Sequence, residues 1–328
     1  MIKVPTFWFK RFHPFSILLF PISLIYILIH NLNRKLKTEV KVNVPIVCIG
    51  NLILGGAGKT SVVIALRKLL HKKFANIYVL TRGYKGSHRS MHFVSKTDDV
   101  DLVGDEAILH KQYGNVLVAK NRIDGAKACI DRNADLIILD DGFQSKHVKK
   151  DVSFIVCDAQ MQFGNKMCIP SGPLRETISS GIKRTDAIIF IQRNNEKLDL
   201  NIQNKIPVFY AKRIIKTNVN IKKKIFAFCG LGNPESFFNS IRDIGFEIVK
   251  RKIFPDHYSY SHEEILELKK LANLDNLVLI TSEKDILRLN KQDRKNINTV
   301  SSEILFLEKK RLCDFLMGET LYKKKKRN

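Results

Sequence analysis

The residues best suited to chemistry lie in a glycine-rich segment that follows an apolar run. Residues 51–60 read Asn-Leu-Ile-Leu-Gly-Gly-Ala-Gly-Lys-Thr, and a helix-compatible stretch follows at residues 61–70. Backbone N–H groups of such a loop close around phosphate oxygens, while Lys59 reaches the β- and γ-phosphates and Thr60 ligates magnesium. Ile53 replaces the usual first glycine, so the pattern is degenerate. The segment still predicts a phosphate-binding loop with nucleotide-binding residues Asn51, Gly55, Gly56, Ala57, Gly58, Lys59 and Thr60.

Two adjacent carboxylates follow another apolar run. Asp140 and Asp141 come directly after residues 136–139, which have the pattern of a buried strand. A phosphate-binding loop that handles a nucleotide needs an acid at such a strand end to hold magnesium and its water. An Asp-Gly turn would explain Asp141 alone. We predict that both carboxylates serve magnesium, and the sequence leaves open which of them touches the metal.

Other candidates are weaker when taken one at a time. Asp105 and Glu106 open a probable helix, where the first turn favours carboxylates with or without a function. His257 follows Asp256 between a predicted strand and a predicted helix, and it could act as a base or as an orienting group. Further candidate phosphate or metal contacts are Arg82, Arg122, Arg175 and Glu176. Turn or surface roles would suffice for any one of them.

Alternating strands and helices must position these residues. Strand-like runs occupy residues 44–50, 77–81, 116–119, 136–140, 154–158 and 187–192, and then 225–229, 246–253, 277–281 and 304–307, with a helical stretch at 262–271. This alternation is typical of an α/β fold with a mostly parallel sheet and helices on both faces, here of the P-loop NTPase-like type. We place a boundary near residue 215, which predicts a P-loop domain at 41–215 and a smaller C-terminal α/β domain at 216–320.

The amino-terminal segment has a membrane signature. Residues 15–29 are uncharged and almost wholly apolar, and basic residues flank them on both sides. The run is shorter than the roughly 20 residues of a full span, so a short span and an interfacial helix both remain open. A cleaved signal peptide or a buried core helix are the alternatives. We expect a membrane anchor with basic flanks at residues 1–40 and a basic tail at 321–328.

The charge balance predicts an anionic partner. The chain has 328 residues, and 56 Lys and Arg against 32 Asp and Glu give a formal net charge of +24. Nucleic acid, anionic lipid and phosphorylated substrates would all respond to that charge, although part of it reflects a Lys-rich composition. The six cysteines contain no C-x-x-C pair, so they indicate buried thiols in a reducing compartment rather than disulfides or a zinc site.

Taken together, these residues resemble the tetraacyldisaccharide 4'-kinases of Gram-negative bacteria, which phosphorylate the lipid A precursor. The resemblance runs in order through residues 50–51, 59–60, 82–84, 104–106, 140–144, 173–176, 254–257 and 281–285. It implies Mg-ATP as the donor and a membrane-embedded tetraacyldisaccharide 1-phosphate as the acceptor. Phosphorylation of the acceptor 4'-hydroxyl would form lipid IVA, in a cleft between two α/β domains.

The resemblance also implies roles for individual residues. Asp105 becomes the general base or a positioning group, with His257 as its partner, and Lys59 keeps its catalytic place in the loop. The implied metal set is Thr60, Asp140, Asp141 and Glu176, and the implied supporting groups are Glu106, Arg122 and Arg175. We further expect a monomer at the cytoplasmic face of the inner membrane, held by its amino-terminal helix and by anionic lipids.

Two competing functions follow from the same residues. A soluble P-loop kinase or NTPase with a polar substrate would require the apolar amino-terminal run to be core. A basic nucleic-acid-binding ATPase would bind DNA or RNA in a salt-sensitive way. The sequence has neither a known nucleic-acid fold nor basic residues interleaved with aromatics on a strand, so we expect no nucleic acid partner.

Overall fold

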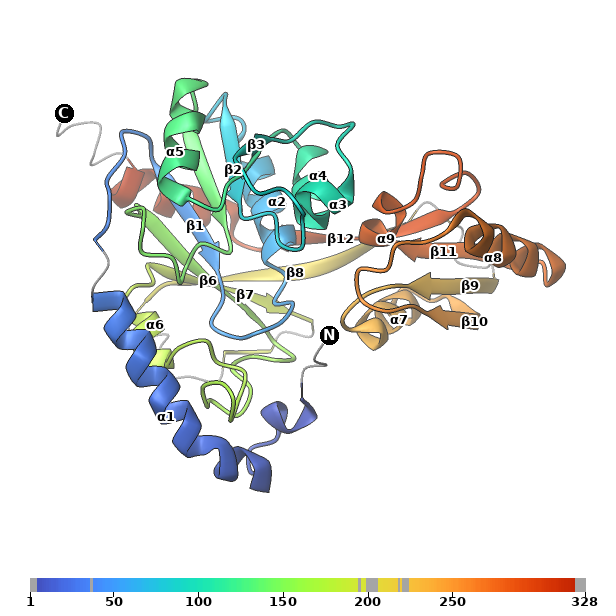
Figure 1. Cartoon of the computed structure of the whole chain (residues 1–328), viewed down its shortest axis with the longest axis horizontal. Coiled ribbons are helices and arrows are strands. Elements are labelled where there is room, and N and C mark those ends of the chain that lie inside the picture. The colour runs from blue at the N-terminus through green and yellow to red at the C-terminus, as the bar shows by residue number, and fades with distance from the viewer. Residues whose placement is uncertain are drawn as a thin grey trace.

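The computed structural model of the chain describes residues 5–35, 38–193, 196–198, 206–217, 219 and 224–321. The charged part of the expected basic tail, residues 323–327, lies outside this range. Within the described residues the strands form one twelve-stranded sheet in the order β10-β9-β11-β12-β8-β7-β6-β1-β5-β2-β4-β3. Helices cover both faces of the sheet (Figure 1), which confirms the predicted α/β class.

The larger part of the molecule is built on six parallel strands with a short antiparallel edge. The parallel strands are β1 (Ile46–Gly50), β2 (Ile77–Thr81), β4 (Asn115–Val118), β5 (Leu136–Asp140), β6 (Val152–Asp158) and β7 (Ala187–Gln192), and the edge strand is β3 (His92–Phe93). Val47 and Ile49 pack into one hydrophobic core, whereas Ile46 and Cys48 pack into another on the opposite face. Both faces are therefore buried, which is why these strands are apolar without alternation.

Several helices of the larger part begin next to residues whose side chains favour a helix start. They are α2 (Lys59–Leu70), α3 (Val100–Val103), α4 (Asp105–Lys111), α5 (Arg122–Asp131) and α6 (Ile178–Ile182). Side chains of Asp99, Asn121 and Thr177 cap the first turns of α3, α5 and α6. The helix α2 follows β1 through the glycine-rich loop, so this loop lies at the carboxyl end of the parallel sheet.

The smaller part has its own pair of hydrophobic cores. It contains β9 (Lys224–Cys229), β10 (Glu247–Ile253), β11 (Val278–Ser282), α7 (Pro234–Asp243), α8 (His262–Leu274) and α9 (Glu283–Leu287). A capping box joins Ser261 and Glu264 at the start of α8. The three strands are parallel, so the loop that carries His257 follows the carboxyl end of β10.

Two long antiparallel strands connect the parts. β8 (Val208–Thr217) runs from the larger to the smaller part, and β12 (Asn298–Phe306) runs back beside it (Figure 1). The sequence analysis did not anticipate β8, and the boundary expected at residue 215 lies inside it. The chain then returns: α10 (Lys309–Phe315) and the last helical turn η2 (Leu316–Leu321) place Leu312 and Leu316 in the core of the larger part.

The amino-terminal run forms a single long helix. A short helical turn η1 (Thr6–Phe9) precedes α1 (Pro14–Lys35), and residues 14–34 are long and apolar enough to cross a membrane. Only 11% of the residues in its apolar window are buried. Its exposed side chains include Leu18, Ile22, Ile25 and Leu28, which form an apolar surface without a protein partner among the described residues. A soluble core helix would bury most of this surface, so that alternative is not supported.

Candidate active site

The phosphate-binding loop has a lysine directed back over it. Lys59 Nζ donates a hydrogen bond to Asn51 Oδ1 at 3.1 Å and lies 3.6 Å from Asp141 Oδ1. Burial lowers the pKa of Lys59, and the nearby Asp141 carboxylate opposes this shift. Gly58 has a φ of +84°, and a Cβ there would approach Ile191 and Arg213 to 3.0 Å. The loop therefore needs glycine at this position.

Asp140 is buried at the end of β5, and its two carboxylate oxygens have different surroundings. Its Oδ2 lies 2.8 Å from His110 Nε2, and its backbone oxygen accepts a hydrogen bond from Arg122 at 3.0 Å. Its Oδ1 is buried and has no hydrogen-bond partner among the described residues. A buried carboxylate oxygen without a partner is costly unless a ligand satisfies it. Asp140 is thus suited to direct contact with a cation.

Asp141 belongs to a cluster of opposite charges. Arg175 Nη1 donates to both of its carboxylate oxygens, at 3.0 and 3.1 Å. Burial alone would raise the pKa of Asp141, but Lys59 and Arg175 reverse this effect and lower it. The backbone of Asp141 has a φ of +52°, which turns the chain sharply after the strand. The lowered pKa favours an ionised carboxylate, which balances the charges of Lys59 and Arg175.

Two expected ligand-binding residues have other contacts. Arg122 is buried and donates to the backbone oxygens of Leu80 and Asp140, so it ties strands together instead of facing the loop. Burial lowers the pKa of Arg122 to about 10. Glu176, which the resemblance placed in the metal set, is 2% exposed and pairs with Arg34 at 3.3 Å and with Arg184. Both arginines contact Oε2, whereas Oε1 accepts, among the described residues, only a long hydrogen bond from Gln144 at 3.4 Å.

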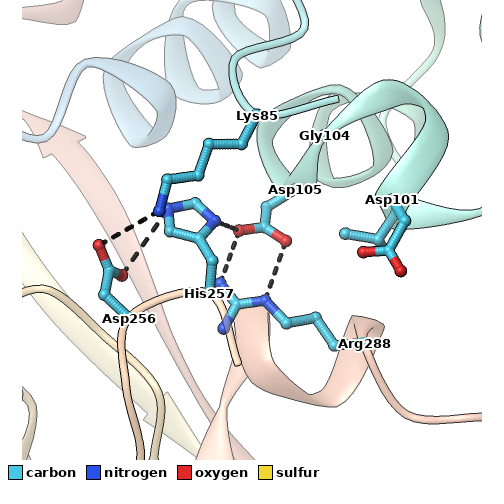
Figure 2. Close-up of a pocket in the computed structure, with 8 residues that line it drawn as sticks. Lys85, Asp101, Gly104, Asp105, Asp256, His257 and Arg288 are labelled. Carbon is cyan, nitrogen blue, oxygen red and sulfur yellow. Dashed lines mark hydrogen bonds and ion pairs between the residues drawn. The ribbon is translucent and has the colours of Figure 1, made fainter. Parts of the chain in front are cut away.

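A second group of charged residues surrounds Asp105 (Figure 2). Asp105 is 1% exposed, and its Oδ2 lies 2.6 Å from His257 Nδ1 and 2.6 Å from Arg288 Nη2. Arg288 Nε donates to the other oxygen at 3.0 Å. Burial alone would raise the pKa of Asp105, but the hydrogen bonds from His257 and Arg288 outweigh it and hold the pKa well below its usual range. The sequence analysis paired Asp105 with His257, and the structure brings these two residues together.

A cavity of about 200 Å³ opens beside this group. It is lined by Lys85, Val100, Asp101, Gly104, Asp105, Asp256, His257 and Arg288. Figure 2 shows His257 and Arg288 pointing toward Asp105, with Lys85 near Asp256. The cavity is polar and contains a histidine whose second ring nitrogen, Nε2, lies 3.7 Å from Asp256 Oδ1. Such a site suits proton transfer to or from a hydroxyl group.

The carboxylates at the start of α4 do not cap the helix. Gly104 occupies the N-cap position, and no side chain caps this end. Asp105 and Glu106 instead extend to the smaller part, where Glu106 Oε1 lies 2.7 Å from Lys284 Nζ. The helix also links both groups of site residues, because Asp105 is its first residue and His110, near its end, contacts Asp140.

Three residues of the site, Arg288, Lys284 and His110, were not predicted from the sequence. Arg288 and Lys284 lie in or just after residues 281–285, which carried part of the resemblance, but their roles were not recognised. The spacing of Arg288 from Asp285, three residues on one helical turn, was the available signal. His110 had no such signal, since its contact with Asp140 depends on how α4 packs against β5.

The helix α1 contacts the same site through one loop. Ser23 Oγ donates to the Cys168 backbone oxygen at 2.9 Å, and Tyr26 donates to the Arg175 backbone oxygen at 2.7 Å. Near the end of the helix, Arg34 pairs with Glu176. The residues contacted by α1 therefore include Arg175, whose side chain holds Asp141.

The fold and this site define a P-loop phosphotransferase of the α/β class. The family model for tetraacyldisaccharide-1-P 4'-kinase matches residues 15–320. The chain belongs to this family. Tetraacyldisaccharide 4'-kinase of Rickettsia akari is 34% identical over 88% of this chain and 90% of the relative, and that of Rickettsia typhi is 35% identical over 90% and 93%.

A solved structure shares the fold. The "apo" form of LpxK from Aquifex aeolicus in complex with ATP superposes with a TM-score of 0.77 and 24% identity, covering 92% of this chain and 98% of that one. The structural alignment includes both the larger and the smaller part of the molecule, because it leaves so little of either chain unaligned.

Proposed function

We propose that this protein transfers the γ-phosphoryl group of ATP to the 4'-hydroxyl of a tetraacyldisaccharide 1-phosphate lipid, forming lipid IVA. The observation that carries the proposal is the placement of two chemical centres on one helix: Asp105 opens α4, and His110 on the same helix contacts Asp140 beside the phosphate-binding loop. A donor site and a proton-accepting site are thus held in fixed relation. The named function of the relatives and the ATP bound to the LpxK structure support the same reaction.

The phosphate-binding loop would neutralise the negative charge of the ATP phosphates. Lys59 and the loop amides would bind the β- and γ-phosphates, and Asn51 and Asp141 keep the lysine in place until nucleotide arrives. Magnesium, when bound, would offset the negative charge of the phosphate groups, and Asp140 and Thr60 would hold it. The residues fit such an ion, because Asp140 offers a buried oxygen that has no partner in the described part of the chain, and Thr60 lies in the first turn of α2. One or two protein ligands are usual for Mg²⁺ beside nucleotide phosphates.

Asp105 and His257 would form the proton-accepting pair. Asp105 is kept ionised by its neighbours, and its contact with Nδ1 fixes the orientation of the imidazole. Transfer of a phosphoryl group depends mostly on positioning and electrostatics, so an aligned acceptor hydroxyl and a place for its proton are what the pair must supply. The cavity beside the pair is where the acceptor hydroxyl would enter.

The helix α1 would lie on the bilayer instead of crossing it. Its contacts with the body run from Ser16 to Arg34, and the indole of Trp8 donates to the Pro170 backbone oxygen at 2.9 Å. A helix bound along one face to a water-soluble body keeps its opposite, apolar face free for the interface. We propose a monomer at the cytoplasmic face of the inner membrane, with the cleft between the larger and smaller parts open to the lipid.

An acceptor comparison tests the proposal. Phosphate transfer from labelled Mg-ATP would be measured with the tetraacyldisaccharide 1-phosphate in mixed micelles and with its fully deacylated sugar in water. Efficient labelling of the lipid 4'-position alone is expected. Equal or better labelling of the soluble sugar, or ATP hydrolysis without transfer, would favour a soluble kinase or NTPase instead.

A further inference from the structure

We propose that Arg288 is a positioning residue for this reaction, which holds the carboxylate of Asp105 in the orientation and charge state that His257 requires. The inference rests on the proposed function, in which Asp105 and His257 accept the proton. Arg288 lies at the carboxyl end of α9, so the smaller part of the molecule would control a residue of the larger part.

The geometry of Arg288 is fixed from two sides. Toward Asp105 it forms a fork, with Nε 3.0 Å from Oδ1 and Nη2 2.6 Å from Oδ2. On its other side Nη1 donates to the Gly230 backbone oxygen at 2.9 Å and to Asp285 Oδ1 at 2.8 Å. The guanidinium group is planar, so contacts at both ends determine the plane of the carboxylate as well. The side chain is 5% exposed, which leaves it little freedom to turn.

The residue that anchors Arg288 is itself held in place. Asp285 Oδ1 accepts hydrogen bonds from the Tyr260 hydroxyl at 2.9 Å and from the Gly230 backbone N–H at 3.0 Å. Asp285 Oδ2 accepts a hydrogen bond from Ser282 at 2.6 Å. Because Asp285 is held in a rigid turn, Arg288 keeps the carboxylate of Asp105 in a fixed position relative to that turn.

Arg288 is the cationic side chain that most directly affects the charge of Asp105, because the other charged neighbours pair with one another. Glu106 pairs with Lys284 at 2.7 Å, and Asp256 lies 3.9 Å from Lys85, so these neighbours largely balance one another. His257 and Arg288 contact Asp105 directly, and they lower its pKa against the opposing effect of burial. Removal of a cation from a buried site favours protonation of every group near it. Without Arg288, Asp105 would hold its proton to higher pH.

A purely structural role for this ion pair predicts something different. In that case Arg288 would only fasten the two parts together, and its loss would lower stability without moving the pH at which activity appears. The chain offers a matched control in Arg294, which donates to the backbone oxygens of Leu289 at 2.9 Å and Leu287 at 3.0 Å. Arg294 supports the same segment but contacts no carboxylate among the described residues.

The test is the pH profile of kcat/KM for lipid phosphorylation by the full-length wild type, Arg288→Met, Arg288→Lys and Arg294→Met. We expect Arg288→Met to move the acidic limb upward by about one to two pH units. Arg288→Lys should leave the limb near the wild-type position but lower kcat by about tenfold or more, because an ammonium group does not reproduce the fork. Arg294→Met should lower the melting temperature without moving the limb.

A second measurement does not depend on activity. Titration of the Asp105 carboxyl group, followed by carbon-13 NMR in aspartate-labelled protein and assigned with Asp105→Asn, should move to higher pH in Arg288→Met. An unmoved titration, or an unmoved acidic limb in a folded Arg288→Met variant, would overturn the inference. Failure of the wild type to phosphorylate the lipid would instead contradict the proposed function, and the NMR titration would still decide the role of Arg288.

Discussion

At the scale of single residues, the donor site depends on one lysine that is poised before nucleotide binds. Lys59 makes contacts with Asn51 and Asp141 that ATP phosphates would replace. We expect Lys59→Met to lower kcat by at least about two orders of magnitude, because a preorganised charge at the moving phosphoryl group is lost. The melting temperature should change little.

Lys72→Met provides the matched control, since Lys72 is exposed beyond the end of α2. It should retain wild-type turnover in the same steady-state assay. Near-normal activity of Lys59→Met would show that the donor site has been placed wrongly.

The two adjacent aspartates should respond differently to magnesium. Asp140 has a buried oxygen without a partner among the described residues, whereas Asp141 is occupied by Arg175. We expect Asp140→Asn to raise the Mg²⁺ concentration for half-maximal activity by about tenfold or more, and Asp141→Asn to raise it less. Titration of activity with Mg²⁺ at saturating ATP measures this. The reverse order would assign direct metal contact to Asp141.

The sequence predicted site residues where chemistry and chain order coincide. Lys59 and Asp140 follow predicted strands, so the parallel sheet alone brings them to one edge. Arg288 and His110 were not recognised because their partners are distant in sequence and meet only through packing. The resemblance implied a metal role for Glu176, which stays a prediction; the contacts of its carboxylate with Arg34 on α1 and with Arg184 were not predictable from the sequence.

At the scale of elements, the two faces of α1 have different roles, which substitutions can test separately. Its polar face holds the loop at residues 168–176, and its apolar face is exposed. We expect Ser23→Ala to destabilise the protein by about 1–3 kcal/mol, because the Ser171 backbone N–H loses its buried acceptor. Leu28→Ser, on the exposed face, should weaken binding to anionic liposomes without changing stability.

Thermal unfolding in detergent and liposome co-sedimentation measure the two effects separately. If Leu28→Ser lowered the melting temperature and left liposome binding intact, the assignment of the two faces would be incorrect.

Strand positions were predictable to within a few residues where both faces of the sheet are buried, as for β2 and β5. Strands of this kind are continuous apolar runs in the sequence. β8 was missed for the opposite reason. Its second half reads Lys-Arg-Ile-Ile-Lys-Thr, so the run of residues 208–217 has neither the continuous apolar pattern of a buried strand nor a regular alternation. The boundary predicted at residue 215 fell within it.

At the scale of the whole molecule, charge and apolar surface should act together at the membrane. The formal net charge of +24 predicts attraction to anionic lipid, which falls as salt rises. We expect deletion of residues 1–35 to abolish most liposome binding, and deletion of residues 322–328 to reduce only its salt-sensitive part. Co-sedimentation with anionic liposomes over a salt series measures both. Undiminished binding by both deletion variants would contradict the membrane role.

The whole account depends on transfer of phosphate to a lipid hydroxyl at the Asp105 site. The most direct measurement is transfer of labelled γ-phosphate from Mg-ATP to purified tetraacyldisaccharide 1-phosphate in mixed micelles, with wild type and Asp105→Ala side by side. We predict robust labelling of the lipid by the wild type and a collapse of labelling in a folded Asp105→Ala variant. Labelling that survives in the variant, or ATP hydrolysis by the wild type without lipid labelling, would contradict the account.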